Sequence, residues 1–305
     1  MKILGVIPLY YPGSDLARNI NSFIRHTDKL MLLDNTPEVL GDLPLLLEQI
    51  APDCIVYMRA GRNVGIGRVL NTAITYAREG GYTHLLTMDQ DSYFKEGDFE
   101  NYLGAIRRYG EDSSVIFSTN YFLKSQQSTL YSVSDTVDEV SSAMTSGSIY
   151  PISLFNRLGD FNEGLFVWGI DCEFSWRASR KNVPTFCFKN IQLQHDLGYQ
   201  KKKHRLLGKE VFPNEYAPDR TYYNVRNGMI LHRFYPDKID LKAHLRYHLY
   251  KRVIFVLLYE DQKWKKWKAL WDGYRDGKSG KVGERGKTTR LVKRAKDGSF
   301  EKDMG

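Results

Sequence analysis

The chain has 305 residues, of which 42% are hydrophobic and 26% charged, which suits one large globular domain or one domain with a helical appendage. This composition excludes disorder over most of the chain. The formal net charge of +8 favours anionic partners such as nucleotides, phospholipid headgroups or nucleic acid, without choosing among them. The cysteines at positions 54, 172 and 187 have no CxxC spacing, which argues against a zinc site or disulfide framework and fits a reducing compartment.

The first half of the chain alternates strand-like and helix-like segments. Apolar runs predict strands at Ile3–Leu9, Lys29–Leu33, Cys54–Arg59 and His84–Met88. Helices are expected after Ser14, near Leu43–Ile50, and from the loop Asn63–Gly67 to Gly80. Such alternation predicts an α/β fold with a mainly parallel sheet, helices on both faces, and ligands at the carboxyl ends of the strands.

The second half is less regular. It contains a small-residue stretch at Ser141–Ser148, a helix starting near Asp171, a strand at Thr185–Leu193 and a helix across Tyr222–His232. From Leu241 to Trp271, aromatic and basic residues interleave with aliphatic ones, and a Gly/Lys/Arg-rich tail follows. We therefore predict a domain over residues 1–235, divided near residue 115, then a helical region over 236–275 and a flexible basic tail over 276–305.

Two carboxylates stand at the end of the fourth predicted strand. Asp89 and Asp91 are separated by one residue, so their side chains point the same way if the chain stays extended. Hard oxygen ligands at a strand end suit Mg²⁺ or Mn²⁺ shared with a diphosphate. The alternative is an ordinary turn, since Asp and Ser are common turn residues and a bare DxD pattern is frequent by chance.

Four segments occur in a characteristic order: IPLYYP, LLDNTP, RNVGIGRVLNTAI and MDQDS. Together they resemble the N-terminal half of family-2 inverting glycosyltransferases, most closely the rhamnosyltransferase-like branch. The resemblance extends over about residues 1–235. It implies a GT-A fold, which is a Rossmann-like, mostly parallel mixed sheet flanked by helices. It also makes residues 1–115 the nucleotide-sugar half and residues 116–235 the acceptor half, with the helical region as a C-terminal appendage.

The resemblance also implies a set of site residues. Asp91 and His195 would bind Mg²⁺ or Mn²⁺, although a lone histidine is usually structural. Asn35 can equally be a turn residue, and Gly65 can serve only a tight turn. The residues implied for nucleotide or donor binding are Pro8, Tyr10, Asp34, Asn35, Asn63, Gly65, Asn71, Asp89, Gln90 and Gly147.

The segment FVWGIDCEF resembles the family's acceptor-side motif, in which a carboxylate ahead of a helix is the catalytic base. Asp171 occupies that position, and Trp168 and Glu173 fall on the acceptor side, with Trp168 where the branch often has aspartate. Both acids can instead favour a helix N-terminus, and Glu173 is weighed as a cap or an orienting group.

Two basic segments complete the resemblance. The RxYYxxRN segment offers Arg220 and Arg226, which could pair with phosphate oxygens, while its tyrosines can be helix packing. The KKKHR run, Lys201 to Arg205, is a solvated loop or a basic flap.

The expected function is inverting transfer of L-rhamnose from dTDP-rhamnose to an acceptor hydroxyl in cell-surface polysaccharide synthesis, with a UDP-hexose or UDP-galactofuranose donor as the alternative. The acceptor can be a glycan carried on polyprenyl diphosphate. A sugar nucleotidyltransferase should show a Gly-rich basic loop, and IPLYYPGSD has none. A non-catalytic membrane or nucleic-acid binding module is the distant alternative; no RNP-type motif occurs, so no nucleic-acid partner is expected.

The expected location is the cytoplasm, with peripheral attachment to the inner face of the membrane. We interpret the N-terminal apolar run as a strand, not a signal peptide. The apolar stretch Val253 to Tyr259 is far below the roughly 20 residues that span a bilayer. The aromatic and basic region after Leu241 could lie on a membrane surface or pack on the domain.

Overall fold

The computed structural model describes residues 1–41, 43, 47–48, 50, 52–111, 114–195, 204–206, 209–211, 215–294 and 300–302. The chain divides into two compact units. The first comprises Met1–Phe161 and Phe174–Leu197, and the second comprises Asn162–Glu173 and Gly198–Gly305. This division differs from the predicted boundary at residue 235, because Asn162–Glu173 and the predicted helix near Tyr222–His232 belong to the second unit.

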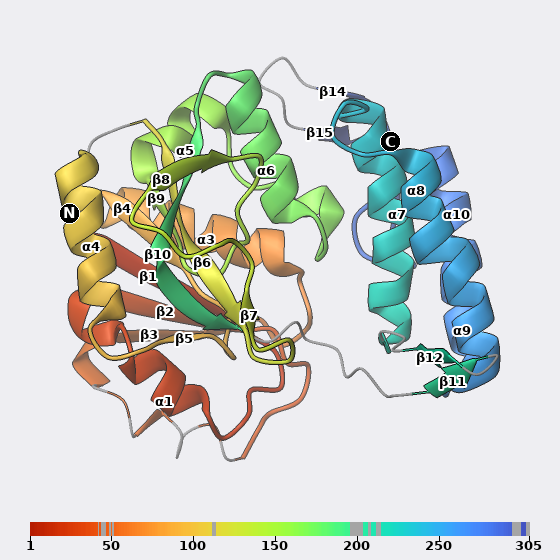
Figure 1. The fold of residues 1–305 in the computed structure, drawn as a ribbon, viewed down its shortest axis with the longest axis horizontal. Helices are drawn as coiled ribbons and strands as arrows, with labels where there is room; N and C mark the ends of the chain where they lie inside the picture. The colour runs from red at the N-terminus through yellow and green to blue at the C-terminus, as the bar shows by residue number, and fades with distance from the viewer. Residues whose placement is uncertain are drawn as a thin grey trace. The chain divides into compact units, whose positions relative to one another are not determined.

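The first unit is built on one mixed sheet (Figure 1). Its order is β3-β2-β1-β4-β9-β6-β10-β5, with β7 on β6 and β8 on β10. The β1–β2, β2–β3, β1–β4 and β6–β10 pairs are parallel, which confirms the predicted fold class. The strands are β1 Ile3–Leu9, β2 Lys29–Asp34, β3 Ile55–Arg59, β4 His84–Thr87, β5 Tyr93–Phe94, β6 Ile116–Leu123, β7 Ser128–Thr129, β8 Val137–Val140, β9 Ser148–Pro151 and β10 Thr185–His195.

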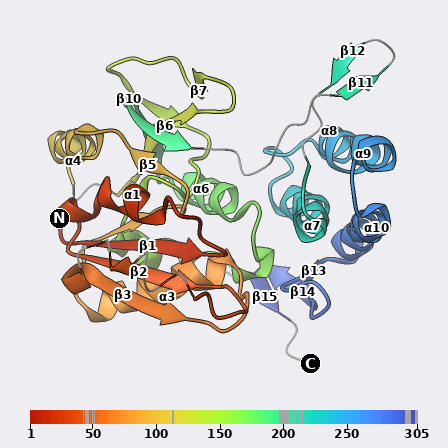
Figure 2. The same cartoon turned by 90° about the horizontal axis from the view of Figure 1, so that it is seen from below.

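Helices cover both faces of this sheet, and α1 and α3 lie on opposite sides of β1 (Figure 2). Apolar residues of β1, including Ile3 and Ile7, share one core with Leu16 of α1 and Phe99 of α4. The buried face of α3 repeats at helical spacing, with Leu70, Ile74 and Ala77, as its sequence predicts. The helices are α1 Leu16–Asn21, α3 Ile66–Glu79, α4 Asp98–Tyr109, α5 Ile152–Leu158 and α6 Ile170–Arg180, and the first turn of α6 belongs to the second unit.

The predicted strands of the first half are all present. The helix expected near Leu43–Ile50 falls largely outside the described residues. Lys201 to Lys203 of the basic run also fall outside them, and the run's last two residues begin strand β11. Strand β6 and helix α4 were not predicted, although β6 is almost entirely buried and α4 buries one apolar face.

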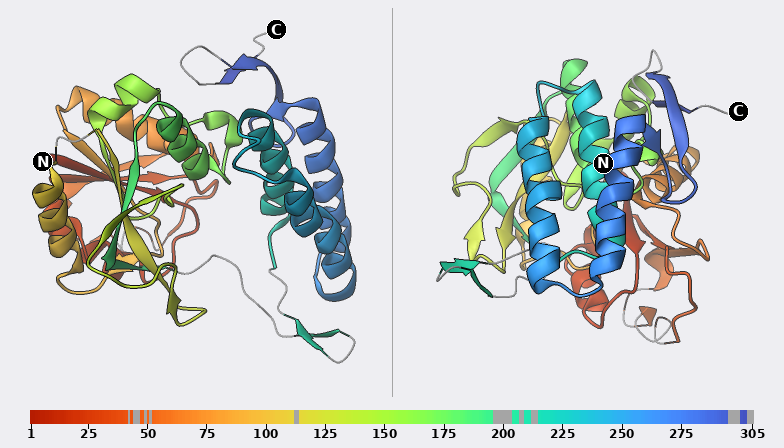
Figure 3. Two further views of the ribbon diagram at one scale, coloured as in Figure 1. Left: turned by 45° about the horizontal axis from the view of Figure 1, so that its top comes forward. Right: turned by 90° about the vertical axis from the view of Figure 1, so that its right-hand side faces the viewer.

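The second unit is mainly helical, and the right-hand view of Figure 3 shows its long helices side by side. It confirms the predicted C-terminal helices. Among the described residues, no helix is both long and apolar enough to cross a membrane. The helical elements are the 3₁₀ turn η3 Glu163–Leu165, α7 Pro218–Phe234, α8 Leu241–Leu245, the π-helical turn η4 Arg246–Tyr250, α9 Lys251–Tyr259 and α10 Lys263–Ser279. The strands are β11 His204–Leu206, β12 Lys209–Val211, β13 Lys281–Val282, β14 Thr289–Arg294 and β15 Phe300–Lys302.

Within the described residues 276–294 and 300–302, the structure corrects the flexible tail that was expected over residues 276–305. Helix α10 continues to Ser279, and β13, β14 and β15 form a three-stranded sheet. Two glycines of α10 face α7 at positions with no room for a side chain. A Cβ on Gly273 would lie 2.7 Å from the Tyr222 carbonyl oxygen, and a Cβ on Gly277 would lie 2.9 Å from the Met229 sulfur. Asp276 is buried and accepts a hydrogen bond of 2.9 Å from the Tyr222 hydroxyl. Gly273 and Gly277 therefore allow the close contact between α10 and α7.

Candidate functional site

Three potential metal ligands meet at the carboxyl edge of the sheet in the first unit. Asp89 and Asp91 follow β4, and His195 is the last residue of β10. Their ligand atoms all lie within 4.8 Å of one another, and His195 Nδ1 is 4.0 Å from Asp89 Oδ2. His195 lies more than 100 positions after the two aspartates in the sequence, so the sheet brings it to them. Two carboxylates and an imidazole fit a divalent cation, and the cluster could hold one.

Buried polar residues hold this cluster in place. Ser92 is fully buried, and its hydroxyl lies 2.8 Å from His195 Nδ1. The Asp89 backbone N–H donates to the Ser146 hydroxyl at 3.0 Å, and the Tyr121 hydroxyl donates to the Ser146 carbonyl at 2.9 Å. The sequence analysis missed Ser92, Ser146 and Tyr121 as positioning residues. Only Ser92 carried a local signal, since it directly follows the acidic motif.

Gln90 organises the chain just beyond β1. Its amide makes two hydrogen bonds to the backbone of Tyr10: it accepts from the N–H at 2.9 Å and donates to the carbonyl at 3.0 Å. The Tyr10 side chain is left 48% exposed, and its ring packs edge-on against Tyr11 with 4.7 Å between centroids. Pro8 lies two residues earlier, within β1. The structure thus gives Gln90 a positioning role, while nucleotide contact by Pro8 and Tyr10 stays a prediction.

Asp34 and Asn35, at the end of β2, are both buried. The Asp34 carboxylate accepts from the Thr36 N–H at 2.8 Å and from the Tyr57 hydroxyl at 2.9 Å. Burial, followed by this hydrogen bond, raises the pKa of Tyr57 to about 12. Asn35 accepts from the Val64 N–H at 3.3 Å, which ties the end of β2 to the loop before α3. Both side chains are engaged within the protein, and their contact with the base or ribose stays a prediction.

The loop before α3 and the helix itself carry three further candidates. Asn63 accepts from the Gly65 N–H at 3.0 Å, so these two residues form a local turn at the helix start. Asn71 lies further along α3, and its amide makes two hydrogen bonds of 2.9 Å to the backbone of Phe161. The Asn71 amide therefore holds the chain at Phe161, and its contact with the donor stays a prediction.

Gly147 stands at the turn before β9. Its N–H donates to the Thr87 carbonyl at 2.8 Å, which fixes the turn beside the end of β4. A Cβ at this position would lie 2.9 Å from the Thr119 hydroxyl oxygen and 3.0 Å from Leu193 Cδ2. Only glycine fits against these neighbours, which gives Gly147 a packing role. Its contact with the donor sugar stays a prediction.

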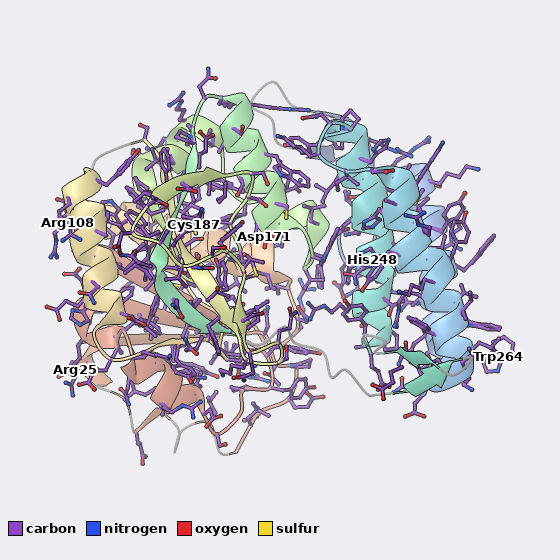
Figure 4. All side chains as sticks on the ribbon, viewed as in Figure 1. Arg25, Arg108, Asp171, Cys187, His248 and Trp264 are labelled. Atoms are coloured by element: carbon purple, nitrogen blue, oxygen red, sulfur yellow. The ribbon has the colours of Figure 1, made fainter. Side chains whose placement is uncertain are left out.

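Asp171 lies in the first turn of α6 and is partly exposed (Figure 4). Its carboxylate accepts from the Cys172 N–H at 2.8 Å. Gly169, two residues earlier, has φ +85°, and a Cβ there would lie 2.8 Å from Leu231 Cδ1. The Gly169 carbonyl accepts from the Glu173 N–H at 3.0 Å, so this residue begins the helix that carries Asp171.

Arg226 and Asn227 of α7 hold the segment that leads to Asp171. Arg226 is fully buried and donates to the carbonyls of Gly164, Leu165 and Gly283 at 3.0, 3.0 and 2.6 Å. Asn227 donates to the carbonyls of Leu165 at 2.8 Å and Trp168 at 2.6 Å. The hypothesis that Arg226 pairs with phosphate is therefore wrong, because its guanidinium is enclosed and hydrogen-bonded to backbone. The Arg226 guanidinium carbon also lies over the rings of Tyr222 and Tyr223, at 5.5 and 4.8 Å from their centroids.

Glu173 and Trp168 have different surroundings within the second unit. Glu173 is 1% exposed and accepts a hydrogen bond of 2.8 Å from the Tyr235 hydroxyl, which favours an orienting role over direct acceptor contact. Trp168 packs against His244 and His248, with ring centroids 5.4 and 5.9 Å away. Burial, aided by the neighbouring His244, lowers the pKa of His248 to about 3. The sequence analysis did not identify His244 and His248 as neighbours of Trp168. Their spacing of four residues, which places two side chains on the same side of a helix, is the signal that could have shown that they lie together.

Comparisons with known proteins agree with this geometry. The family model of glycosyl transferase family 2 matches residues 6–167. The dTDP-rhamnosyl transferase RfbF of Shigella flexneri is 23% identical over 283 residues, which cover 86% of this chain and 90% of RfbF.

Two solved structures are similar in fold. A crystal structure of TarS residues 1–349 from S. aureus, in complex with UDP-GlcNAc, has a TM-score of 0.56 at 16% identity, covering 91% of this chain and 81% of TarS. A crystal structure of GalNAc-T7 with UDP, GalNAc and Mn²⁺ also has a TM-score of 0.56, at 14% identity and 91% coverage of this chain. The chain spans 56% of that GalNAc-T7 chain. The family match covers more than half of the sequence, and the chain belongs to the family-2 glycosyltransferases.

Proposed function

We propose that the protein is an inverting rhamnosyltransferase that uses dTDP-L-rhamnose and a divalent cation. The observation that carries the proposal is the convergence of Asp89, Asp91 and His195 within 4.8 Å at the carboxyl edge of a family-2 sheet. Similarity to a dTDP-rhamnosyl transferase over most of both chains supports the donor. The acceptor is a hydroxyl of a cell-surface glycan that is assembled in the cytoplasm, for example on polyprenyl diphosphate.

The transfer is a single displacement at the anomeric carbon. The acceptor oxygen forms its bond to this carbon as the bond from the carbon to the diphosphate oxygen breaks, and the nucleotide diphosphate leaves. Asp171 takes the proton of the acceptor hydroxyl, a general-base role that typically contributes ~10²–10⁴-fold to the rate. Its position at the start of α6 supports this role, since the helix N-terminus favours the charged carboxylate.

Mg²⁺ or Mn²⁺ would be held by Asp89, Asp91 and His195. Asp91 is exposed and has a carboxylate available to a bound ion, whereas His195 is buried and oriented by Ser92. A bound cation supplies positive charge that stabilises the departing diphosphate. Mn²⁺ in the GalNAc-T7 crystal structure supports a divalent ion for this fold.

A UDP-sugar donor, such as a UDP-hexose or UDP-galactofuranose, is the second candidate. It is favoured by the two structural neighbours, whose crystals contain UDP or UDP-GlcNAc. The two candidates differ in the transferred sugar, in the base and in the 2′-hydroxyl that UDP has and dTDP lacks, so binding of the free nucleotides separates them. A thymine base carries one methyl group that uracil lacks, and a hydrophobic contact to it is worth roughly 0.8 kcal/mol.

The experiment is a screen of nucleotide sugars for slow hydrolysis with Mn²⁺, which reports the donor without knowledge of the acceptor. We expect dTDP-rhamnose to be hydrolysed fastest, with the rate falling to background on chelation. Asp91→Ala should abolish Mn²⁺-supported binding of dTDP in calorimetry while keeping the melting temperature, because the side chain is exposed. Glu96→Ala, also exposed, is the matched control. Preferred hydrolysis of a UDP-sugar would replace the donor, and undiminished dTDP affinity in Asp91→Ala would remove this metal site.

A further inference from the structure

The helix pair α9–α10 of the second unit presents apolar side chains to solvent in an unusual arrangement. In α9, Arg252 and Val256 are the buried residues. The exposed side chains of η4 and α9 are mostly apolar: Tyr247 44%, Tyr250 61%, Val253 38%, Ile254 52%, Leu257 49% and Leu258 47%. At 100° per residue the last five occupy one side of the helix, and Arg252 lies on the other. The usual amphipathic order, with apolar residues inside, is therefore inverted.

Buried ion pairs fix this orientation. The Arg252 guanidinium forms a two-pronged pair with Glu260, in which Nη2 lies 2.8 Å from Oε2. Lys266 of α10 donates to the same Glu260 oxygen at 2.9 Å and lies 3.4 Å from Glu215. Arg252, Glu260 and Lys266 are each 3% exposed. Rotating α9 to bury its aliphatic side would expose these partners or leave them unpaired at a large cost, so the apolar side remains outward.

Helix α10 adds a second exposed stripe. Trp264, Lys268, Trp271 and Arg275 follow one another at spacings of four, three and four residues, which places them on one side of the helix. Trp264 is 81% exposed and Trp271 is 65% exposed. Figure 4 shows Trp264 projecting outward at the start of α10. Indole rings flanked by basic side chains are typical of the boundary between lipid headgroups and acyl chains.

The exposed charged side chains around the apolar stripes of α9 and α10 indicate an anionic partner. In residues 241–275, all of which the structure describes, Asp261 is the single exposed acidic residue. Exposed basic residues are Lys242, Arg246, Lys251, Lys263, Lys265, Lys268 and Arg275. A second copy of the chain would bring these like charges together, whereas an anionic surface would neutralise them. Lys251 lies over the rings of Tyr247 and Phe255, at 5.3 and 5.2 Å, so positive charge and apolar surface are adjacent.

We propose that the α9–α10 face docks on an anionic lipid bilayer. The face comprises the exposed apolar residues of η4 and α9 with Trp264 and Trp271 of α10. Its aliphatic and aromatic side chains enter the headgroup region, and the surrounding lysines and arginines contact lipid phosphates. This inference does not depend on the sugar or nucleotide of the donor.

The test is flotation of the full chain with vesicles of phosphatidylcholine alone or mixed with phosphatidylglycerol. We expect binding to the mixed vesicles and weaker binding at high salt. Ile254→Ser combined with Leu257→Ser should weaken binding to the vesicles at least about tenfold, because the two apolar side chains no longer contribute the free energy of their transfer from water into the bilayer. Val39→Ser, at a position that is 79% exposed in the first unit, is the matched control.

A second variant tests the charge separately. Lys263→Glu with Lys265→Glu places acids in the first turn of α10, where the helix dipole favours them, so folding should be kept. It should reduce binding to the mixed vesicles, while Arg107→Glu with Arg108→Glu on α4 should not. Unchanged binding in both α9–α10 variants would overturn the proposal. A lipid-free dimer in sedimentation that the Ile254/Leu257 variant converts to monomer would also overturn it, because the face would then be a subunit interface.

Discussion

At the residue scale, Asp171 and Glu173 are two carboxylates with different expected tasks. Asp171 is partly exposed, whereas Glu173 is buried against Tyr235. Asp171→Asn keeps the shape of the side chain and removes its ability to accept a proton. We therefore expect transfer to fall by about 10²–10⁴-fold with the affinity for the nucleotide sugar unchanged. Parallel measurement of transfer rate and donor affinity checks this.

Glu173→Gln is the matched variant, since its amide oxygen can still accept from the Tyr235 hydroxyl. We expect a smaller loss than for Asp171→Asn. If Glu173→Gln were the more damaging change, or if Asp171→Asn kept near-wild-type turnover, the base would have to be reassigned.

The sequence analysis predicted Asp91 and His195 as metal ligands and Asp89 as a donor contact. The structure brings all three together, because Asp89 and Asp91 follow β4 and His195 ends β10 at the same edge of the sheet. The sequence analysis did not predict what Asn71 and Arg226 do. Their hydrogen-bond partners are backbone groups 90 and about 60 residues away, and a local pattern contains no information about such partners. Arginine in a motif looks like a phosphate ligand, and only burial shows that it is a backbone clamp.

At the element scale, Gly169 controls the start of α6. Alanine there would be strained at φ +85° and would crowd Leu231. We expect Gly169→Ala to shift the first turn of the helix and lower the transfer rate by about 10–100-fold, since small misplacements of a catalytic group are costly. Gly81→Ala is the matched control, with φ +62° but nothing within 4 Å of its Cβ. It should lose about 1–2 kcal/mol of stability and keep full activity; equal activity losses in both variants would contradict the positioning role.

The turn η4 contains a histidine that makes folding sensitive to acid. Burial and the neighbouring His244 and Arg252 lower the pKa of His248 to about 3, against about 6.5 in the unfolded chain. Between these values the unfolded chain binds a proton that the folded chain does not, so stability is lost as the pH falls from about 6.5 toward 3. The expected slope is about 1.4 kcal/mol per pH unit for this group.

Urea unfolding at several pH values from 7 to 4 measures that slope. His248→Phe should unfold with a shallower dependence on pH, because the packing against Trp168 is kept and the titration is removed. Equal slopes for His248→Phe and the wild type would contradict the assignment.

Elements with a regular apolar period were the most predictable part of the fold. The predicted strand at Ile3–Leu9 and the helix ending at Gly80 agree with β1 and α3. Apolar periodicity is a poor guide to burial in α9. Arg252 is buried by ion pairs, whereas Leu257 and Leu258 are exposed to solvent. Composition was also misleading at the end of α10, because the flexible tail was predicted to begin at residue 276, whereas Gly277 packs against Met229 of α7.

At the scale of the whole molecule, the second unit joins segments that are far apart in the chain. The sequence boundary at residue 235 followed a change in composition. The unit is instead defined by contacts of Asn162–Glu173 with α7 and with the residues after α10. Composition cannot show this, because the residue that joins these segments is a charged arginine inside the helix predicted across Tyr222–His232.

Arg226 makes that junction, so its removal should destabilise the whole second unit. Arg226→Met would shorten the side chain and remove its hydrogen bonds to the carbonyls of Gly164, Leu165 and Gly283. The Gly164 and Leu165 carbonyls would keep the Gly283 N–H and the Asn227 amide as donors. Each hydrogen bond from the charged guanidinium is worth about 1.5–3 kcal/mol, partly offset by the apolar replacement, so we expect the free energy of unfolding to fall by about 3 kcal/mol or more. Urea unfolding measures it, with Arg220→Met, an exposed position on the same helix, as the control. A loss below about 1 kcal/mol would mean that water or backbone rearrangement satisfies these carbonyls and that Arg226 is not the clamp of the unit.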